Sequence, residues 1–174
     1  CHTFYATPGI YMNLSKERGR PFAYYSYGTS VTEVTLNTIN GTYTIDSIDI
    51  VHDVGQSLSK DIDKGQIEGA AIQGMGWATI EQIRYGIGGK VLTGANAYKI
   101  PDIKFCPEKF NVTLLENSDN PYAVCNSKAV GEPPFLHGLG AYFAVIEALK
   151  SIRKDKPAPS LPITPEKVFM YIYE

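Results

Sequence analysis

This sequence of 174 residues has few cysteines, no large excess of positive or negative charge, and few long apolar runs. The three cysteines, Cys1, Cys106 and Cys125, are odd in number and widely spaced, which argues against a disulfide framework and against a zinc site. Free thiols are typical of a reducing compartment, so we expect a cytoplasmic protein. Because no apolar run is long enough to cross a bilayer, we expect no membrane association.

An excess of either charge is also missing. The 16 Lys and Arg residues are matched by 18 Asp and Glu residues, which gives a formal net charge of −2. No basic patch favours a nucleic acid as partner. The sequence does hold 44% hydrophobic and 20% charged residues, an ordinary balance for a globular protein. Its length suffices for one hydrophobic core, so residues 1–174 are interpreted as a single domain.

Two neighbouring segments in the first third of the chain alternate apolar and polar side chains, as β-strands do. Between them lies Asn40-Gly41, a dipeptide that is typical of tight hairpin turns. The alternation changes phase between Ile45 and Ile48, which predicts a β-bulge near Ser47. The sequence therefore predicts an N-terminal β-hairpin within an antiparallel or mixed sheet.

Two long helices and one short helix are expected to pack on this sheet. The first helix is expected to begin at Asp63, which forms a capping-box pattern with Gln66. The second follows Pro134, and its apolar face is predicted to be Leu136, Leu139, Phe143, Ile146 and Leu149. Residues 165–173 open on Thr-Pro-Glu, a typical helix start, and are expected to form a short terminal helix. The predicted class is therefore α+β.

The remaining segments are expected to connect these elements. Residues 1–20 show no hydrophobic period and are expected to form an irregular lead-in. Residues 110–115 and 122–125 are predicted to be strands. Residues 155–164 contain three prolines and are expected to act as a stiff linker. His137 has no partner at a ligand spacing, so we expect it to pack locally or to lie on the surface.

One carboxylate lies in a sequence that restricts the backbone. Glu132 follows Gly131 and precedes Pro133 and Pro134, directly ahead of the second long helix. Proline fixes its own φ and disfavours the α region for the residue before it. We therefore expect Glu132 on a stiff corner, where a general base would keep one geometry. An acidic residue at a helix start is also favoured by the helix dipole, so a purely structural role is the alternative.

The first long helix is rich in glycine. Its four glycines are Gly65, Gly69, Gly74 and Gly76. Each interior glycine costs about 1 kcal/mol relative to alanine, which natural sequences accept where another backbone or a ligand comes close. Gln66 and Gln73 are seven residues apart and share a helix face. Two interpretations stay open: tight packing with Gln66 as a cap, or a small-residue surface beside a flat ligand.

Five motifs follow one another along the chain. They are FAYYSYG at 22–28, DVG at 53–55, GQIEG at 65–69, YKIP at 98–101 and SKAVGEPP at 127–134. In this order they resemble the C-terminal part of the molybdopterin-binding region of the xanthine dehydrogenase and aldehyde oxidase family, the molybdenum hydroxylases. The resemblance runs from about Pro21 to Lys154. The two prolines after Glu132 favour the xanthine dehydrogenase branch.

This resemblance implies a molybdenum-dependent oxidoreductase. In that family a glutamate at the Glu132 position is the general base, a glutamine at the Gln66 position hydrogen-bonds the pterin, and backbone at the Val130 position lies at the cofactor. The reaction implied is hydroxylation of an N-heterocycle such as a purine, or of an aldehyde, with oxygen from water. No residue of this chain is expected to ligate the metal, and 2Fe-2S and FAD are expected on partner domains or subunits.

The resemblance also implies a missing partner. The other half of the molybdopterin-binding region, which completes the cofactor site and the substrate pocket, has no counterpart here. The chain begins with Cys rather than Met, and we interpret it as a subunit or fragment that is inactive in isolation. The alternative is a non-catalytic scaffold or interaction fragment with the same fold and no cofactor. A glutamate-dependent hydrolase is disfavoured, because no nucleophile or metal-ligand set accompanies the glutamate.

Overall fold

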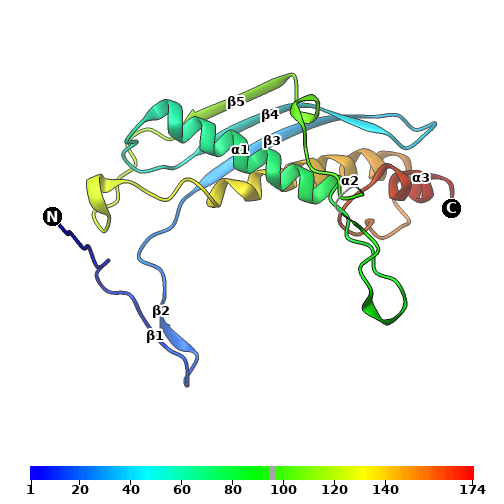
Figure 1. Cartoon of the computed structure of the whole chain (residues 1–174). Helices are drawn as coiled ribbons and strands as arrows, with labels where there is room; N and C mark the ends of the chain where they lie inside the picture. Colours follow the sequence, from blue (N-terminus) through cyan, green and yellow to red (C-terminus); the bar gives the residue numbers. More distant parts are fainter. Residues whose placement is uncertain (95–96) are drawn as a thin grey trace.

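The structure is a computed structural model that describes residues 1–94 and 97–174. Within these residues it contains a three-stranded sheet, three α-helices and a separate two-stranded ribbon. The ribbon pairs β1 (Tyr11–Asn13) with β2 (Arg18–Arg20) and stands away from the main body near the N-terminus (Figure 1). The predicted α+β class is confirmed.

The prediction of an irregular lead-in at residues 1–20 is wrong, because this segment contains the β1–β2 ribbon. Asn13 closes its turn by accepting hydrogen bonds from the Ser15 hydroxyl and the Lys16 backbone N–H. All six strand residues are exposed. A ribbon without a buried face has no hydrophobic alternation, so the pattern used to find strands could not reveal it.

The main sheet has the strand order β3–β4–β5. β3 (Gly28–Leu36) and β4 (Tyr43–His52) form an antiparallel hairpin, whereas β5 (Lys109–Leu114) runs parallel to β4. The sheet is therefore mixed, which is one of the two arrangements that the sequence predicts. The strand predicted at residues 110–115 is confirmed as β5, one residue earlier.

The predicted hairpin turn and bulge are both confirmed. Gly41 adopts a φ of 73° in the loop between β3 and β4, a left-handed conformation that glycine adopts without strain. The strand register shifts between Glu33, which faces Ser47, and Val34, which faces Ile45. One extra residue of β4 is accommodated there, at the place where the alternation changes phase.

The short strand predicted at residues 122–125 is wrong. The segment instead ends in a 3-10 turn, η3 (Val124–Asn126), in which Cys125 has a φ of 55°. Asn120 bends the chain, because its side chain accepts from the backbone N–H of Tyr122 and donates to the carbonyl of Ser127. These side chain to backbone bonds compete with an extended conformation.

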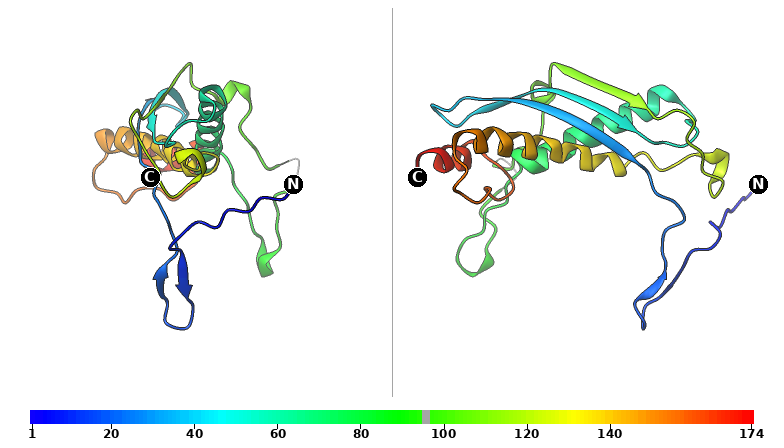
Figure 2. Two further views of the ribbon diagram at one scale, coloured as in Figure 1. Left: turned by 90° about the vertical axis from the view of Figure 1, so that its left-hand side faces the viewer. Right: turned by 180° about the vertical axis from the view of Figure 1, so that it is seen from behind.

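The helices α1 (Lys60–Thr79) and α2 (Gly140–Ile152) lie side by side on one face of the sheet (Figures 1 and 2). α1 begins three residues before the predicted start at Asp63 and has Ser59 at its N-cap position. The Asp63 carboxylate accepts a hydrogen bond from the Ser57 hydroxyl. Gln66 therefore lies inside the helix and does not act as a cap.

The second predicted long helix consists of two segments. A 3-10 helix, η4 (Pro133–Leu139), leads directly into α2. Leu136 and Phe143, predicted on the buried face, are 68% and 62% exposed. The residues that α2 buries are Ala141, Val145, Ile146 and Leu149. A 3-10 helix has three residues per turn, so it rotates its side chains relative to an α-helical pattern extended through it.

Together η4 and α2 span 20 residues, Pro133–Ile152, that are long and apolar enough to cross a membrane by length and composition alone. The expectation that the sequence holds no such run is therefore wrong. In this fold the segment packs on β3 and α1. Its buried residues Ala141, Val145 and Leu149 contribute to the two hydrophobic clusters between the sheet and the helices, and 33% of its apolar window is buried in this fold.

Within residues 155–164, the predicted linker, one residue packs on the core. Ile163 is fully buried, its N–H donates to the carbonyl of Ala78, and its own carbonyl accepts from the Tyr43 hydroxyl at 2.6 Å. The predicted terminal helix is confirmed as α3 (Pro165–Tyr173), with its first turn capped by the Thr164 hydroxyl. The prolines stiffen the backbone locally, but the buried side chain of Ile163 anchors the end of the segment to the core.

α1 and η4 cross where two glycines meet. A Cβ atom on Gly74 would lie 2.1 Å from the carbonyl oxygen of Phe135, and one on Gly138 would lie 2.3 Å from the backbone nitrogen of Met75. A Cβ on Gly69 would contact nothing within 4 Å. Tight packing therefore explains Gly74, whereas Gly69 lies on an open surface.

Replacing Gly74 with alanine is expected to lower the free energy of unfolding by about 2–3 kcal/mol, because the new methyl group would push two backbones apart. Gly69→Ala in the same helix is the matched control, and it is expected to raise the free energy of unfolding by up to about 1 kcal/mol through helix propensity. Urea denaturation of the full chain measures both. Equal stability of the two variants would contradict the close crossing.

Candidate functional site

Glu132 lies at the first turn of η4, beside a hollow of about 790 Å³. Its walls come from α1 and from the chain between residues 129 and 136. The lining residues are Ala70, Gln73, Ala129, Gly131, Glu132, Pro133, Phe135 and Leu136. The side chain of Glu132 is exposed to this space, so the predicted base has access to a ligand.

The backbone of Glu132 differs from the prediction. Its φ of −105° and ψ of −40° lie in the right-handed helical region, which proline was expected to disfavour. The Glu132 carbonyl accepts the N–H of Phe135 at 3.0 Å and so closes the first turn of η4. This hydrogen bond holds Glu132 in the helical region against the preference set by Pro133, so the corner is a helix start rather than an extended bend.

The chain just before Glu132 is held by a buried ion pair. The Lys128 ammonium donates to the Asp53 carboxylate, and these side chains are only 6% and 1% exposed. The same carboxylate accepts from the Ser118 hydroxyl and from the Gly55 backbone N–H. Burial alone would raise the pKa of Asp53, but these hydrogen bonds and the charge of Lys128 outweigh it and lower that pKa. Asp53 is therefore ionised in the fold.

Backbone contacts reinforce this connection. The N–H of Lys128 donates to the carbonyl of Val54 at 2.8 Å, and Gly55 forms a β-bridge with Ser127. One residue on, the N–H of Ala129 donates to the Tyr24 hydroxyl at 3.1 Å. Three of the motifs that follow one another in the sequence, at 22–28, 53–55 and 127–134, therefore meet beside the hollow.

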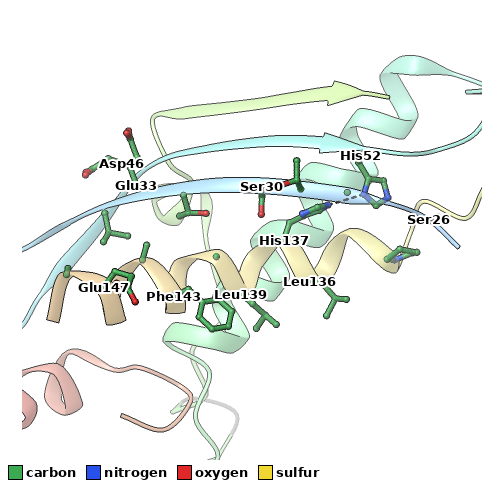
Figure 3. A pocket seen from close by; sticks show the side chains of 18 residues that line it. Ser26, Ser30, Glu33, Asp46, His52, Leu136, His137, Leu139, Phe143 and Glu147 are labelled. Atoms are coloured by element: carbon green, nitrogen blue, oxygen red, sulfur yellow. Dashed lines mark hydrogen bonds between the residues drawn. The ribbon is translucent and has the colours of Figure 1, made fainter. Parts of the chain in front are cut away.

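The chain after Glu132 is held by a pair of buried histidines. Nδ1 of His52 lies 3.0 Å from Nε2 of His137, with the two rings edge to face (Figure 3). Their exposed fractions are 2% and 8%. One ring must donate and the other accept, so the two rings cannot both be charged. Burial lowers the pKa of each ring and so favours the neutral form of both. The sequence predicts local packing or a surface position for His137 and does not identify His52 as its partner, because the two residues are 85 positions apart.

Acid is expected to destabilise the fold through this pair. Burial and the neighbouring His137 lower the pKa of His52 from 6.5 to about 4, against a smaller opposite effect of Asp53, and burial also lowers the pKa of His137. Between pH 6.5 and 4 the unfolded chain takes up a proton at His52 that the folded chain does not. The free energy of unfolding should therefore fall by about 3 kcal/mol over this range.

Urea denaturation at a series of pH values measures this effect. His52→Leu should flatten the pH dependence between pH 6.5 and 4, whereas the exposed His2→Gln control should keep it. Protonation of Asp53 acts in a lower window, because the pKa of this carboxylate is depressed below 3.8. An unchanged slope in the His52 variant would show that the histidine pair does not carry the effect.

A second hollow, of about 1150 Å³, lies on the other side of η4, between this helix, α2 and β3 (Figure 3). The two histidines line its wall, as do three carboxylates, Glu33, Asp46 and Glu147. Glu132 does not line this space. Pro133 and Leu136 line both hollows, so η4 divides them. The larger hollow is therefore separate from the predicted base.

The two other predicted site residues take different places. Gln66 is exposed on α1 and is not among the described residues that line the Glu132 hollow, so its role stays a prediction. Gln73, two helical turns or about 10 Å further along the same face, does line it. Val130 is half-buried and packs on the core. The shared face of the two glutamines was visible in the sequence, but which of them borders Glu132 was not.

The donors at this hollow suit a polar, flat cofactor. The backbone N–H groups of Val130, Gly131 and Glu132 donate to no other residue in the part of the chain that the structure describes. Gly131 and Glu132 line the hollow, so their N–H groups and the Gln73 amide offer hydrogen-bond donors beside small side chains such as Ala70 and Ala129. Between residues 1–94 and 97–174, no group of three His, Cys, Asp or Glu side chains is placed to hold a metal ion. The donor set fits an organic cofactor held through hydrogen bonds.

Fold and hollow together describe an α+β domain with a hollow beside a helix start. The family model of the molybdopterin cofactor-binding domain matches residues 1–107, and the chain belongs to this family. Xanthine dehydrogenase 2 of Arabidopsis thaliana is 37% identical over 186 residues, 99% of this chain and 14% of that protein. Xanthine dehydrogenase of Dictyostelium discoideum is 42% identical over 156 residues, 87% of this chain and 12% of that protein.

Solved structures show the same relationship. The quinoline 2-oxidoreductase of Pseudomonas putida 86 matches with a TM-score of 0.74 and 26% identity, over 81% of this chain and 18% of that chain. The aldehyde oxidoreductase of Desulfovibrio gigas matches with a TM-score of 0.73 and 30% identity, over 90% of this chain and 16% of that chain. The predicted resemblance to the xanthine dehydrogenase and aldehyde oxidase family is confirmed. The chain spans about one seventh of the curated relatives' length.

Proposed function

We propose that this chain supplies the general base and one wall of the cofactor and substrate site in a molybdenum hydroxylase of the xanthine dehydrogenase type. The observation that carries the proposal is the hollow shared by Glu132 and Gln73, next to backbone N–H groups that donate to no other described residue. Relatives that match almost the whole chain and are xanthine dehydrogenases support it. The proposed substrate is an N-heterocycle such as a purine, or an aldehyde.

The residues of this chain would divide the work as follows. Gln73, Gln66 and the N–H groups at Val130 and Gly131 would hold the pterin by hydrogen bonds. When bound, the molybdenum cofactor supplies an acidified, water-derived oxygen and a two-electron acceptor. Glu132 would accept, at a carboxylate oxygen, the proton released when the water-derived oxygen bonds to the substrate carbon. The hydride that leaves this carbon would pass to the two-electron acceptor. The restricted backbone at η4 would keep the carboxylate in reach of the proton.

Other parts of the assembly must complete the site. We propose that a second molybdopterin-binding half closes the hollow, and that iron–sulfur and flavin domains or subunits remove the electrons. The length of the curated relatives, of which this chain covers 14% and 12%, supports such partners. The isolated chain is therefore expected to be inactive.

Metal and pterin analysis of the assembled protein that contains this chain tests the proposal. We expect one molybdenum and one pterin per copy, with turnover in a screen of purines, nicotinate-like rings and aldehydes. In water enriched in oxygen-18, the product should carry the label. A protein without metal, pterin or turnover on any of these substrates would favour the alternative, a scaffold of the same fold.

A further inference from the structure

β4 ends at His52, and Asp53 follows directly. The side chains of these two residues point in opposite directions, as neighbours in an extended chain do. His52 contacts His137, five residues after Glu132, and Asp53 contacts Lys128, four residues before Glu132. Neighbouring positions at the end of one strand therefore hold the chain on both sides of the predicted base.

We propose that these four residues form a clamp that positions Glu132. The clamp consists of His52, Asp53, Lys128 and His137. It acts on Glu132 through the backbone and touches neither substrate nor cofactor, so its members are positioning residues. The proposal rests on the proposed function, because the position of Glu132 affects the rate only if this carboxylate is the base.

Burial distinguishes the clamp from the Glu132 side chain. All four clamp side chains are buried or nearly so. Between them Pro134 is also buried and Val130 is half-buried, whereas Ala129, Gly131, Glu132 and Leu136 are exposed. Among the described residues, the Glu132 carboxylate has no hydrogen-bond partner of its own. Its position therefore depends on how the flanking residues are held.

The chemistry of the contacts fits a role in positioning. Apolar side chains of similar size often stabilise a core as well as a buried ion pair does, because they avoid the loss of hydration. Hydrogen bonds and ion pairs fix the direction and distance of their partners, which apolar packing does less strictly. Here both contacts end on the same strand terminus, so the strand sets the position of Glu132 relative to α1 and the hollow.

Steady-state kinetics of the assembled enzyme test the clamp. His137→Leu keeps a similar volume but removes the bond to His52, and it is expected to lower kcat about 10- to 100-fold with KM changed less than threefold. His137→Gln places an amide where Nε2 lies and is expected to restore kcat to within about threefold of the original enzyme. If His137→Leu does not fold, His137→Asn serves instead, because its shorter amide does not reach His52.

A matched control separates positioning from stability. Val168→Ala removes a fully buried side chain in the second hydrophobic cluster, away from the hollow, and should lower stability without changing kcat. If the His137 variants also keep full kcat while Glu132→Gln loses it, the clamp is overturned and the proposed function stands. If Glu132→Gln keeps full kcat, the proposed function is overturned and the clamp falls with it.

Discussion

Replacing Glu132 with glutamine is expected to lower the kcat of the assembled enzyme by about 10²- to 10⁴-fold, the usual contribution of a general base. Glutamine has nearly the same shape but does not accept the proton, so KM should change little. The side chain is exposed and forms no ion pair among the described residues. Substitutions at such positions change stability little, so the thermal midpoint of the variant should stay within about two degrees of that of the original enzyme. Steady-state kinetics and a thermal melt measure both quantities.

Glu68→Gln is the matched control for this experiment. Glu68 is also exposed, lies on α1, and does not line the hollow, so its variant should keep the original kcat. A purely structural role for Glu132 would show the reverse result, with unchanged kcat and a lower melting temperature, since the carboxylate would then act only on the start of η4.

Breaking the buried ion pair should have the largest effect on stability. Lys128→Met is expected to lower the free energy of unfolding by about 3–5 kcal/mol, because it leaves the Asp53 carboxylate buried without its cation. The double variant Asp53→Asn and Lys128→Met removes both charges and should recover part of this loss. Urea denaturation of the single and double variants, arranged as a double-mutant cycle, measures the coupling.

Lys150→Met is the control for the loss of a lysine. Lys150 forms an exposed pair with Glu147 on α2, and such pairs contribute little to stability, so this variant should unfold at nearly the same urea concentration as the original chain. Equal destabilisation of the Lys128 and Lys150 variants would show that the buried Asp53–Lys128 pair contributes no more to the free energy of unfolding than an exposed pair does.

The elements that the sequence predicted correctly depend on short-range signals. The hairpin turn at Gly41 follows from the backbone freedom of glycine, and the bulge opposite Glu33 follows from a change of phase within one strand. The start of α3 follows from Thr164 as an N-cap. Each signal involves residues within a few positions of one another, so no knowledge of packing was needed.

The features that the sequence did not reveal share a different cause. Leu136 and Phe143 were assigned to the buried face because one α-helical period was extended through a 3-10 segment. Residues 155–164 were interpreted as a linker because the prolines are visible in the sequence, whereas the burial of Ile163 is not. Similarly, Gln73 rather than Gln66 borders the hollow because the crossing point of α1 and η4 decides which turn of the helix lies there.

The sequence by itself determined the α+β class, the family and Glu132 as the candidate base, since motifs, turns and helix starts are written in neighbouring residues. Only the tertiary structure decided how Glu132 is held. Asp53 and Lys128 are 75 positions apart, and His52 and His137 are 85 positions apart. Such pairs form only when the end of β4 meets the chain on both sides of Glu132, because their energy depends on burial and distance, which no local pattern encodes.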